Sequence, residues 1–436
     1  MADQSQGAPT PYAAPGAGTT AVYRGATLFD GTGRPPRPAT TIVTDGQKVT
    51  AVAPDADLAS RLPEGARVFD LDGRFVIPGL IDTHQHLATP PDRPAAEAAL
   101  RRHVYSGITA VRDMADDLRQ IGDLARATLV GEIPGPDIRY AALMAGPGFF
   151  DDPRTHQVSQ GAVPGEVPWM QAVTPATDLP LAVAMARGTY AAAIKVYADL
   201  DADLVAAVTA EAHRQGIPVW AHATVFPATP GQVVAAGVDT VSHVTLLAFE
   251  GTPDGLTSYK SKPPVDHARF TAGDDPHLDR LFALMRRRGT VLDATACMWE
   301  SDELAGGGPE DSARARANTA LAAAVTAQAH RAGVAISTGT DHETAPGAAF
   351  PALHDELAFL VQRCGIPIAD VLRSATLIGA RAAGTEDSMG SVEPGKLANF
   401  VVLDEDPLRD IANLRSVTLT VKRGHRFDRA EFEERR

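Results

Sequence analysis

The pair of histidines at positions 84 and 86 is the first feature of this sequence that could do chemistry. His84 and His86 follow the short apolar run Leu80-Ile81, which comes after Pro78-Gly79. Such a run favours a buried strand, and residues two apart on a strand point to the same face. Two neutral imidazoles on one face, at the end of a strand, form half of a transition-metal site. A His-x-His pair alone is weak evidence, so this interpretation needs further ligands at the ends of later strands.

Four further polar residues lie in or at the end of other predicted strands. These are Lys195 in residues 193–197, His222 in 218–223, His243 in 240–244 and Asp341 in 335–341. Taken singly, His222 or His243 could be a core histidine that is bonded to a backbone carbonyl. Their recurrence at one end of successive strands favours a metal site instead.

Lys195 is harder to explain as a structural residue. It lies in an apolar segment, so its amine should be buried, and a buried ammonium is costly unless it is paired or neutralised. Three explanations are open: an acidic partner, a Schiff-base role, or reaction with CO2 to a carbamate. A carbamate is an anion whose two oxygens could bridge two cations. The Schiff-base alternative does not explain four histidines and an aspartate at the same end of the strands.

The elements that must position these residues alternate between strand and helix from residue 78 to about residue 385. The strands are predicted at 80–86, 109–114, 138–143, 193–197, 218–223, 240–244, 290–295 and 335–341, and the helices include 95–105, 202–215, 278–288 and 313–331. Glycines close several helix-to-strand turns. The pattern predicts a (β/α)8 barrel, whose active site lies at the carboxyl ends of the strands.

The two ends of the chain predict a second, smaller domain. Short strands over 21–29, 40–44, 48–52 and 67–71 read as an antiparallel meander, and strands over 399–403 and 417–422 need a sheet to join. We therefore expect a small β-sandwich from residues 21–77 and 390–430, with the barrel between them at 78–389. Residues 1–20 lack a basic start and an apolar segment, so they read as a disordered arm and not as a secretory signal.

The whole pattern resembles the amidohydrolase superfamily, and within it the imidazolonepropionase-like and metal-dependent prolidase-like branch with a carboxylated lysine. The similar motifs are residues 76–86, 107–114, 339–341 and 390–399, together with the six polar residues in their order along the strands. The resemblance implies two divalent metal ions, expected to be zinc. It implies that His84, His86 and Asp341 hold the first ion, that His222 and His243 hold the second, and that a carbamate on Lys195 bridges them.

The activity expected from this set is hydrolysis of a C–N bond, in an amide, a peptide-like or a cyclic amide substrate, by metal-activated hydroxide. Two divalent cations leave residual positive charge that stabilises hydroxide and an oxyanion. Asp341 is expected to take the proton of the water and deliver it to the leaving nitrogen.

Substrate-binding residues are expected on the loops after strands three, six and seven, near residues 144–167, 246–275 and 297–308. His156, Tyr197 and His342 are the candidates, and Arg112 and Trp299 are weaker ones. One departure from the resemblance stands at Thr224, where dipeptidase-like members are expected to carry a tyrosine. A dipeptide substrate is therefore not assigned.

Two alternatives to a binuclear amidohydrolase are kept. One is a mononuclear deaminase or a lactone or ester hydrolase of the same superfamily, although Lys195 argues against a deaminase. The other is a barrel that binds metal without catalysis.

Composition limits the classes of binding partner that we expect. The chain has 436 residues, of which 44% are hydrophobic, and a net charge of -14. That charge disfavours nucleic acid and anionic membranes as partners and leaves a small-molecule substrate. The 2 cysteines cannot form a cysteine-based zinc site. No apolar run is long enough to span a bilayer, so the cytoplasm is the expected compartment, and a homo-oligomer is left open.

Overall fold

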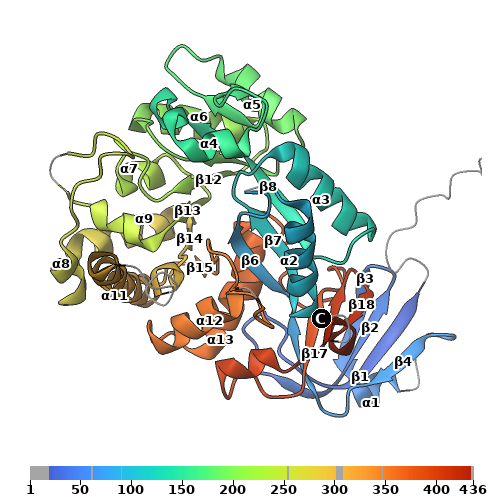
Figure 1. Cartoon of the computed structure of the whole chain (residues 1–436). Coiled ribbons are helices and arrows are strands. Elements are labelled where there is room, and N and C mark those ends of the chain that lie inside the picture. Colours follow the sequence, from blue (N-terminus) through green and yellow to red (C-terminus); the bar gives the residue numbers. More distant parts are fainter. Residues whose placement is uncertain are drawn as a thin grey trace, which may run out of the picture.

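The computed structural model describes residues 19–59, 62–89, 91–252, 255–300, 308–345 and 347–433. Nearly all of the predicted N-terminal arm and part of the predicted loop at 297–308 lie outside these residues. Figure 1 shows a large barrel flanked by a smaller sheet, to which both ends of the described chain contribute.

The barrel consists of eight parallel strands, which confirms the predicted fold. They are β6 (Leu80–Gln85), β7 (Ile108–Asp113), β8 (Asp137–Ala145), β11 (Ala193–Val196), β12 (Val219–His222), β13 (Thr240–Ser242), β14 (Val291–Asp293) and β15 (Ile336–Ser337). The first and the last strand are joined by a hydrogen bond from Thr83 N to Thr338 O of 2.8 Å and one from Asp341 N to His84 O of 3.0 Å. The last strand is shorter than predicted, because the ladder to β6 is irregular after residue 338: Thr340 N donates to the Asp82 side chain, and Asp341 has a φ of 53°.

Helices cover the outside of the barrel. The main ones are α2 (Arg93–Tyr105), α3 (Leu118–Val130), α5 (Leu179–Gly188), α6 (Ala202–Arg214), α7 (Pro230–Ala235), α9 (Pro276–Arg288), α11 (Pro309–Arg331) and α12 (Leu353–Gln362). Most begin at a side-chain cap: the carboxylates of Asp92, Asp117, Asp178, Asp201 and Asp275 and the Thr229 hydroxyl accept hydrogen bonds from the first turns. The strands are buried on both faces, which explains why they read as continuous apolar runs.

Short elements fill the connections at the carboxyl ends of the strands. After β8 come η1 (Pro147–Asp151), α4 (Pro153–Val158), β9 (Glu166–Val167) and β10 (Met170–Ala172), and after β13 come η2 (Val244–Phe249) and α8 (His267–Thr271). The chain leaves the barrel through α13 (Ile368–Arg373), η3 (Ser374–Ile378) and α14 (Gly379–Ala382). Residues of the connections after β8 and β13 line the cavity at the end of the barrel where the predicted ligands lie.

The smaller sheet has eight strands from both ends of the chain. They are β1 (Thr20–Leu28), β2 (Arg37–Asp45), β3 (Lys48–Pro54), β4 (Arg67–Asp70), β5 (Phe75–Pro78), β16 (Phe400–Leu403), β17 (Val417–Lys422) and β18 (His425–Asp428). They form one continuous sheet in the order β18-β17-β16-β5-β1-β2-β3, with β4 beside β1. The antiparallel meander predicted at the N-terminus holds for β1 to β3 only. Both β4 and β5 run parallel to β1, because the chain crosses over through α1 (Asp55–Leu58) before it returns.

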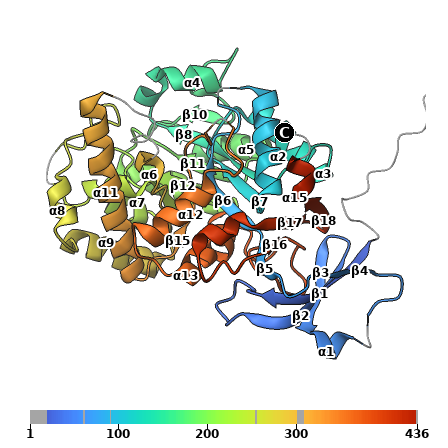
Figure 2. The same cartoon turned by 60° about the horizontal axis from the view of Figure 1, so that its bottom comes forward.

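The two parts are joined by buried charges at the amino end of the barrel. Lys422 Nζ lies 2.9 Å from Asp137 Oδ1, and Arg423 Nε lies 2.8 Å from Asp137 Oδ2. Asp137 opens β8, whereas Lys422 closes β17, so the smaller sheet packs beside the barrel wall (Figure 2). η4 (Ile411–Arg415) packs against α12, and α15 (Arg429–Glu433) against α2 and β17.

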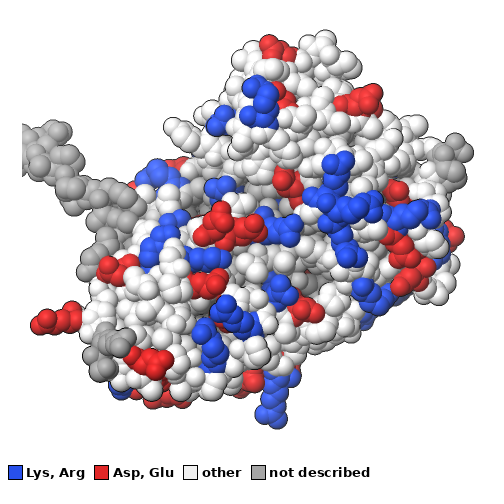
Figure 3. Space-filling model, turned by 180° about the vertical axis from the view of Figure 1, so that it is seen from behind, with Lys and Arg blue, Asp and Glu red and all other residues white. Residues whose placement is uncertain are grey.

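Charges on the face seen in Figure 3 are mixed. Basic side chains occur there in small clusters separated by acidic and uncharged residues, so that face presents no continuous positive surface. Among the described residues, no helix combines the length and the apolar character that a bilayer-spanning segment needs.

Candidate metal centre

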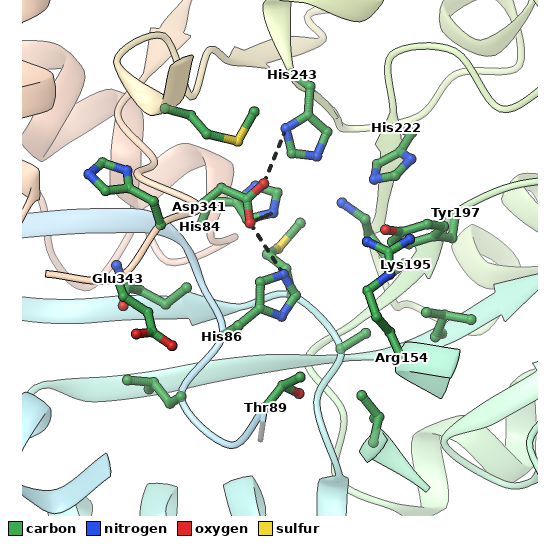
Figure 4. A pocket seen from close by; sticks show the side chains of 18 of the residues that line it. His84, His86, Thr89, Arg154, Lys195, Tyr197, His222, His243, Asp341 and Glu343 are labelled. Atoms are coloured by element: carbon green, nitrogen blue, oxygen red, sulfur yellow. Dashed lines mark ion pairs between the residues drawn. The ribbon is translucent and has the colours of Figure 1, made fainter. Parts of the chain in front are cut away.

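A cavity of 940 Å³ lies at the carboxyl ends of the barrel strands and contains all six predicted metal ligands (Figure 4). They are His84, His86, Lys195, His222, His243 and Asp341. Each comes from the end of its strand or directly after it, which is where barrel enzymes place their active sites. The structure therefore brings together residues that are far apart in the sequence.

Asp341 is the centre of this group. Its Oδ1 atom lies 3.5 Å from His84 Nε2 and 3.4 Å from His86 Nε2, and its Oδ2 atom lies 3.6 Å from His243 Nδ1. These separations are longer than ordinary hydrogen bonds. Ligand atoms of His84, His243 and Asp341 all lie within 4.8 Å of one another. Nitrogen and carboxylate donors that converge in this way suit a divalent cation.

Two buried carboxylates orient the first pair of imidazoles. His84 Nδ1 lies 2.7 Å from Asp293 Oδ2, and His86 Nδ1 lies 2.9 Å from Asp116 Oδ1. An ionised carboxylate only accepts hydrogen bonds, so Nδ1 carries a hydrogen in both rings, and Nε2 is the ring nitrogen that faces Asp341. Metal-binding histidines are commonly held by a carboxylate in this way.

Asp293 also joins four barrel strands below the cavity. Its carboxylate accepts hydrogen bonds from Arg112 Nη2 (3.1 Å), Ser242 Oγ (2.8 Å) and Thr83 Oγ1 (2.9 Å). Burial opposes ionisation of Asp293, but His84 and Arg112 outweigh it and hold the pKa of this carboxyl well below its usual range. The sequence interpretation named neither Asp293 nor Asp116 as a functional residue. An acid that ends the apolar strand β14 was the available signal for Asp293.

The imidazoles of His84, His222 and His243 are neutral. Burial is the largest cause that lowers the pKa of His84 and His222, and it lowers the pKa of His243 to about 3. A neutral ring is the form that binds metal. His86 differs. Burial lowers its pKa, but the opposing effect of Asp116 and Asp341 is larger, so the pKa of His86 lies well above its usual value. A cation bound beside His86 must therefore compete with a proton.

Lys195 and His222 have polar atoms that lack a partner. Lys195 is fully buried, and within the described part of the chain neither its Nζ nor His222 Nδ1 makes a hydrogen bond. Burial lowers the pKa of the Lys195 amine to about 7, with Arg112 adding to the effect and two carboxylates opposing it. Unpartnered buried polar atoms are costly. These two, beside the converging donors around Asp341, fit a site made to hold metal.

The three predicted substrate-binding residues are placed differently. Tyr197 and His342 line the cavity, and His342 Nδ1 lies 3.0 Å from Thr340 O. His156 is exposed on α4 and lies outside the cavity lining, whereas Arg154 and Thr155 of the same helix line it. The weaker candidate Trp299 also lines the cavity, and Arg112 is the buried partner of Asp293.

Comparisons with known proteins agree with this geometry. The amidohydrolase family profile matches residues 75–426. The imidazolonepropionase of Micrococcus luteus is 24% identical over 413 residues, which cover 87% of this chain and 91% of that protein. A solved Xaa-Pro dipeptidase with bound methionine superposes with a TM-score of 0.70 at 22% identity, covering 94% of this chain and 100% of that one. Aspergillus niger ochratoxinase superposes with a TM-score of 0.73 at 21% identity, covering 94% and 96%.

The chain belongs to the amidohydrolase family. Members are metal-dependent hydrolases that act on carbon–nitrogen bonds, which confirms the predicted class of enzyme. The solved structures are less than 25% identical to this chain, so they show the barrel with its additional sheet and no more.

Proposed function

We propose that this protein is a binuclear metal-dependent amidohydrolase that cleaves a C–N bond of a small amide, peptide-like or cyclic amide substrate. The observation that carries the proposal is Lys195, a fully buried amine without a hydrogen-bond partner among the described residues, within a set of imidazoles and one carboxylate. A carbamate on this lysine would supply the anion that two cations need between them.

The ligand sets are those that the resemblance to the superfamily implies. His84, His86 and Asp341 would hold one cation, and His222 and His243 the other, with carboxylated Lys195 between them. Two divalent cations bound there, expected to be zinc, would polarise the scissile carbonyl and lower the pKa of the attacking water. Asp293 and Asp116 hold the rings of His84 and His86 with Nε2 turned toward the cavity.

The acid–base work falls to Asp341. Burial disfavours its charge, but His84 and the neighbouring His86 and His243 outweigh burial and hold the pKa of Asp341 far below its usual range. It is therefore an acceptor at neutral pH. It takes a proton from the attacking water as the C–O bond forms, and passes that proton to the nitrogen as the C–N bond breaks. The products are a carboxylic acid and an amine.

Metal content together with a lysine series tests the proposal. Elemental analysis of the purified chain should give two divalent ions per chain, and Lys195→Ala should lose activity and at least one of them. Lys195→Glu should retain part of the metal, because it places a carboxylate nearby. Lys48→Ala, which removes an exposed amine of the smaller sheet, is the control.

A mononuclear site would give a different metal content. If growth with added zinc yields no more than one ion per chain, and Lys195→Ala keeps it, the site is mononuclear. The compact group of His84, His243 and Asp341 would then be the ion's site, and a deaminase-like activity would replace the proposed one. Assays over a panel of amides, lactams and lactones identify the bond that is cleaved.

A further inference from the structure

We propose that the wall of the cavity beside His222 binds an anionic group of the substrate, so that the substrates are amides that carry a carboxylate next to a flat apolar group. The binding residues are Arg154, Tyr197, Tyr259 and Lys262, which we call the anion wall. This inference rests on the proposed function for the reaction, but it concerns recognition and can be tested by binding alone.

Charge is unevenly distributed around the cavity. Its acidic lining residues are Asp92, Glu343 and the ligand Asp341, and Figure 4 shows Glu343 and Asp341 on the side of His86. Arg154 and Tyr197 extend from the opposite side, next to Lys195 and His222. Arg102 also lines the cavity, from α2, the helix that Asp92 caps. An anionic group therefore meets a favourable field on one side of the metal centre and repulsion on the other.

Lys262 provides an ammonium that makes no salt bridge with any described residue. Its Nζ lies 3.9 Å from the centre of the Tyr259 ring and 5.9 Å from that of Phe226. Within the described part of the chain, no carboxylate oxygen lies within 4.0 Å of it, whereas its neighbour Lys260 pairs with Asp151 at 3.8 Å. Cation–π contact holds the ammonium in place, and no carboxylate of the described residues offsets its charge. A chain with a net charge of -14 gains most from such a local cation if it must admit an anion.

Arg154 is fixed by a neighbouring carboxylate. Its Nη2 lies 2.7 Å from Asp152 Oδ2 and its Nε lies 3.0 Å from Asp152 Oδ1. The hydrogen bonds to Asp152 are the largest cause that raises the pKa of Arg154, and the nearby Tyr197 and Tyr259 add to them while burial opposes. Asp152 engages Nε and Nη2 of the guanidinium, and the Tyr259 side chain interacts with it as well, so these two residues hold the Arg154 side chain where it lines the cavity.

The aromatic residues complete this wall. The Tyr197 ring lies 4.5 Å from that of Phe149 and 5.6 Å from that of Tyr259, and Tyr259 stacks on His222 at 5.8 Å. The Tyr197 side chain lines the cavity, and its phenolic hydroxyl can donate a hydrogen bond to a carboxylate. The wall thus offers hydrogen-bond donors and cations beside apolar ring faces, which suits a carboxylate on a flat group.

The loop that carries Tyr259 and Lys262 is held in advance of binding. Asp199 Oδ1 accepts hydrogen bonds from Tyr259 N at 2.9 Å and from Ser258 Oγ at 3.2 Å. Asp199 follows β11, the strand of Lys195. Asp199 therefore connects the loop of Tyr259 and Lys262 to the strand that carries Lys195. Because this loop is already ordered, substrate binding costs little conformational entropy there.

Calorimetry on the metal-loaded full chain tests the inference without turnover. Benzoate should bind at least tenfold more tightly than benzamide, which has nearly the same shape and no charge. Lys262→Met should weaken benzoate about tenfold and leave benzamide within twofold, and Arg154→Met should act in the same direction. Lys260→Met, two residues away and paired to Asp151, is the control, and metal content is measured in every variant.

Hydrolysis of N-benzoyl amino acids and of their carboxamides gives the second readout. The acids should have the higher kcat/KM, and Lys262→Met should reduce that preference by raising KM. If benzoate binds no better than benzamide, or if Lys262→Met and Arg154→Met leave its affinity unchanged with metals intact, the inference is wrong. If the binding pattern holds but no amide is cleaved, the anion wall stands and the proposed function fails.

Discussion

Asp341 is the residue on which the proposed chemistry depends most. It faces three imidazoles and has no other acid within the compact ligand group. Asp341→Asn keeps the shape of the side chain but removes its ability to accept a proton, so kcat should fall by about 10²–10⁴-fold. Circular dichroism and thermal unfolding should show a folded barrel. Turnover near the wild-type value would contradict the role.

Asp293 should control metal affinity through His84. In Asp293→Asn the side-chain amide can donate toward His84 Nδ1, which favours the tautomer whose Nε2 carries the hydrogen and cannot bind metal. Loss of such a supporting carboxylate typically weakens metal binding about 10–100-fold. Competition with a chelator measures the change. Asp123→Asn, at an exposed acid of α3, should leave the affinity unchanged.

At this scale the sequence indicated the six proposed ligands, but not the carboxylates that orient them. The six proposed ligands were recognisable because each is a polar residue in or next to an apolar strand. Asp293 satisfied the same criterion, but its role depends on a contact with His84 across 209 residues of sequence, which no local pattern specifies. Arg154, Tyr259 and Lys262 lie on connections without a periodic pattern, so their convergence could not be predicted.

At the scale of an element, the turn after β15 leaves little space around the proposed metal centre. A Cβ atom at Gly339 would overlap Asp293 Oδ1 and would lie 2.6 Å from the His84 Cβ. Gly339→Ala should therefore displace both residues, with a loss of metal and at least a tenfold loss of activity. Gly188→Ala is the matched control, because nothing lies within 4 Å of that position in α5. Equal activity and metal content in the two variants would show that the turn adapts.

Helix α12 holds the end of β14 through a buried acid. Glu356 accepts hydrogen bonds from Ala296 N at 3.1 Å and Cys297 N at 2.7 Å, and burial raises its pKa to about 7 from an ordinary 4.5. Between these two pH values the unfolded chain has lost a proton that the folded chain retains. This group therefore lowers the free energy of unfolding as pH rises from 4.5 to 7.

Glu356→Gln should remove this pH dependence. Between pH 4.5 and pH 7, the free energy of unfolding of the variant should rise by up to about 3 kcal/mol relative to that of the wild type. Any difference in stability that does not depend on pH adds equally at both ends of this range. Asp82, whose pKa burial also raises to about 7, is unchanged in both proteins and cancels from the difference. Urea unfolding at several pH values measures it. A difference that does not vary with pH would show that Glu356 is already ionised in the folded protein.

Elements were predicted more reliably than their pairing. The barrel order followed from the alternation of strands and helices, because parallel strands joined by helices allow few arrangements. The direction of β4 and β5 did not follow, since their short runs fit either an antiparallel or a parallel partner. Their pairing is decided by contacts with β1 and with β16, which arrives more than 300 residues later.

At the scale of the molecule, Asp137 joins the smaller sheet to the barrel. Burial opposes its charge, but Lys422 and Arg423 outweigh burial and lower its pKa. Asp137→Asn would leave two cations without their carboxylate, one of them buried, and should cost about 3–5 kcal/mol of stability. With saturating metal and substrate, kcat should stay near wild type, because Asp137 is at the opposite end of β8 from the cavity. A loss of kcat without a loss of stability would contradict this division of roles.

The hydrogen bond between Asp341 and His84 links the last barrel strand to the first, and it has a consequence for protein synthesis. A ribosome that adds about 5–20 residues per second needs roughly 10–50 s to travel between these two positions. During that interval the nascent chain holds His84 and His86 on an incomplete sheet whose last strand, with its aspartate, does not yet exist. Tight loading of the first ion would therefore wait until the barrel is closed, and its uptake would report that the last barrel strand has been made and has paired with the first.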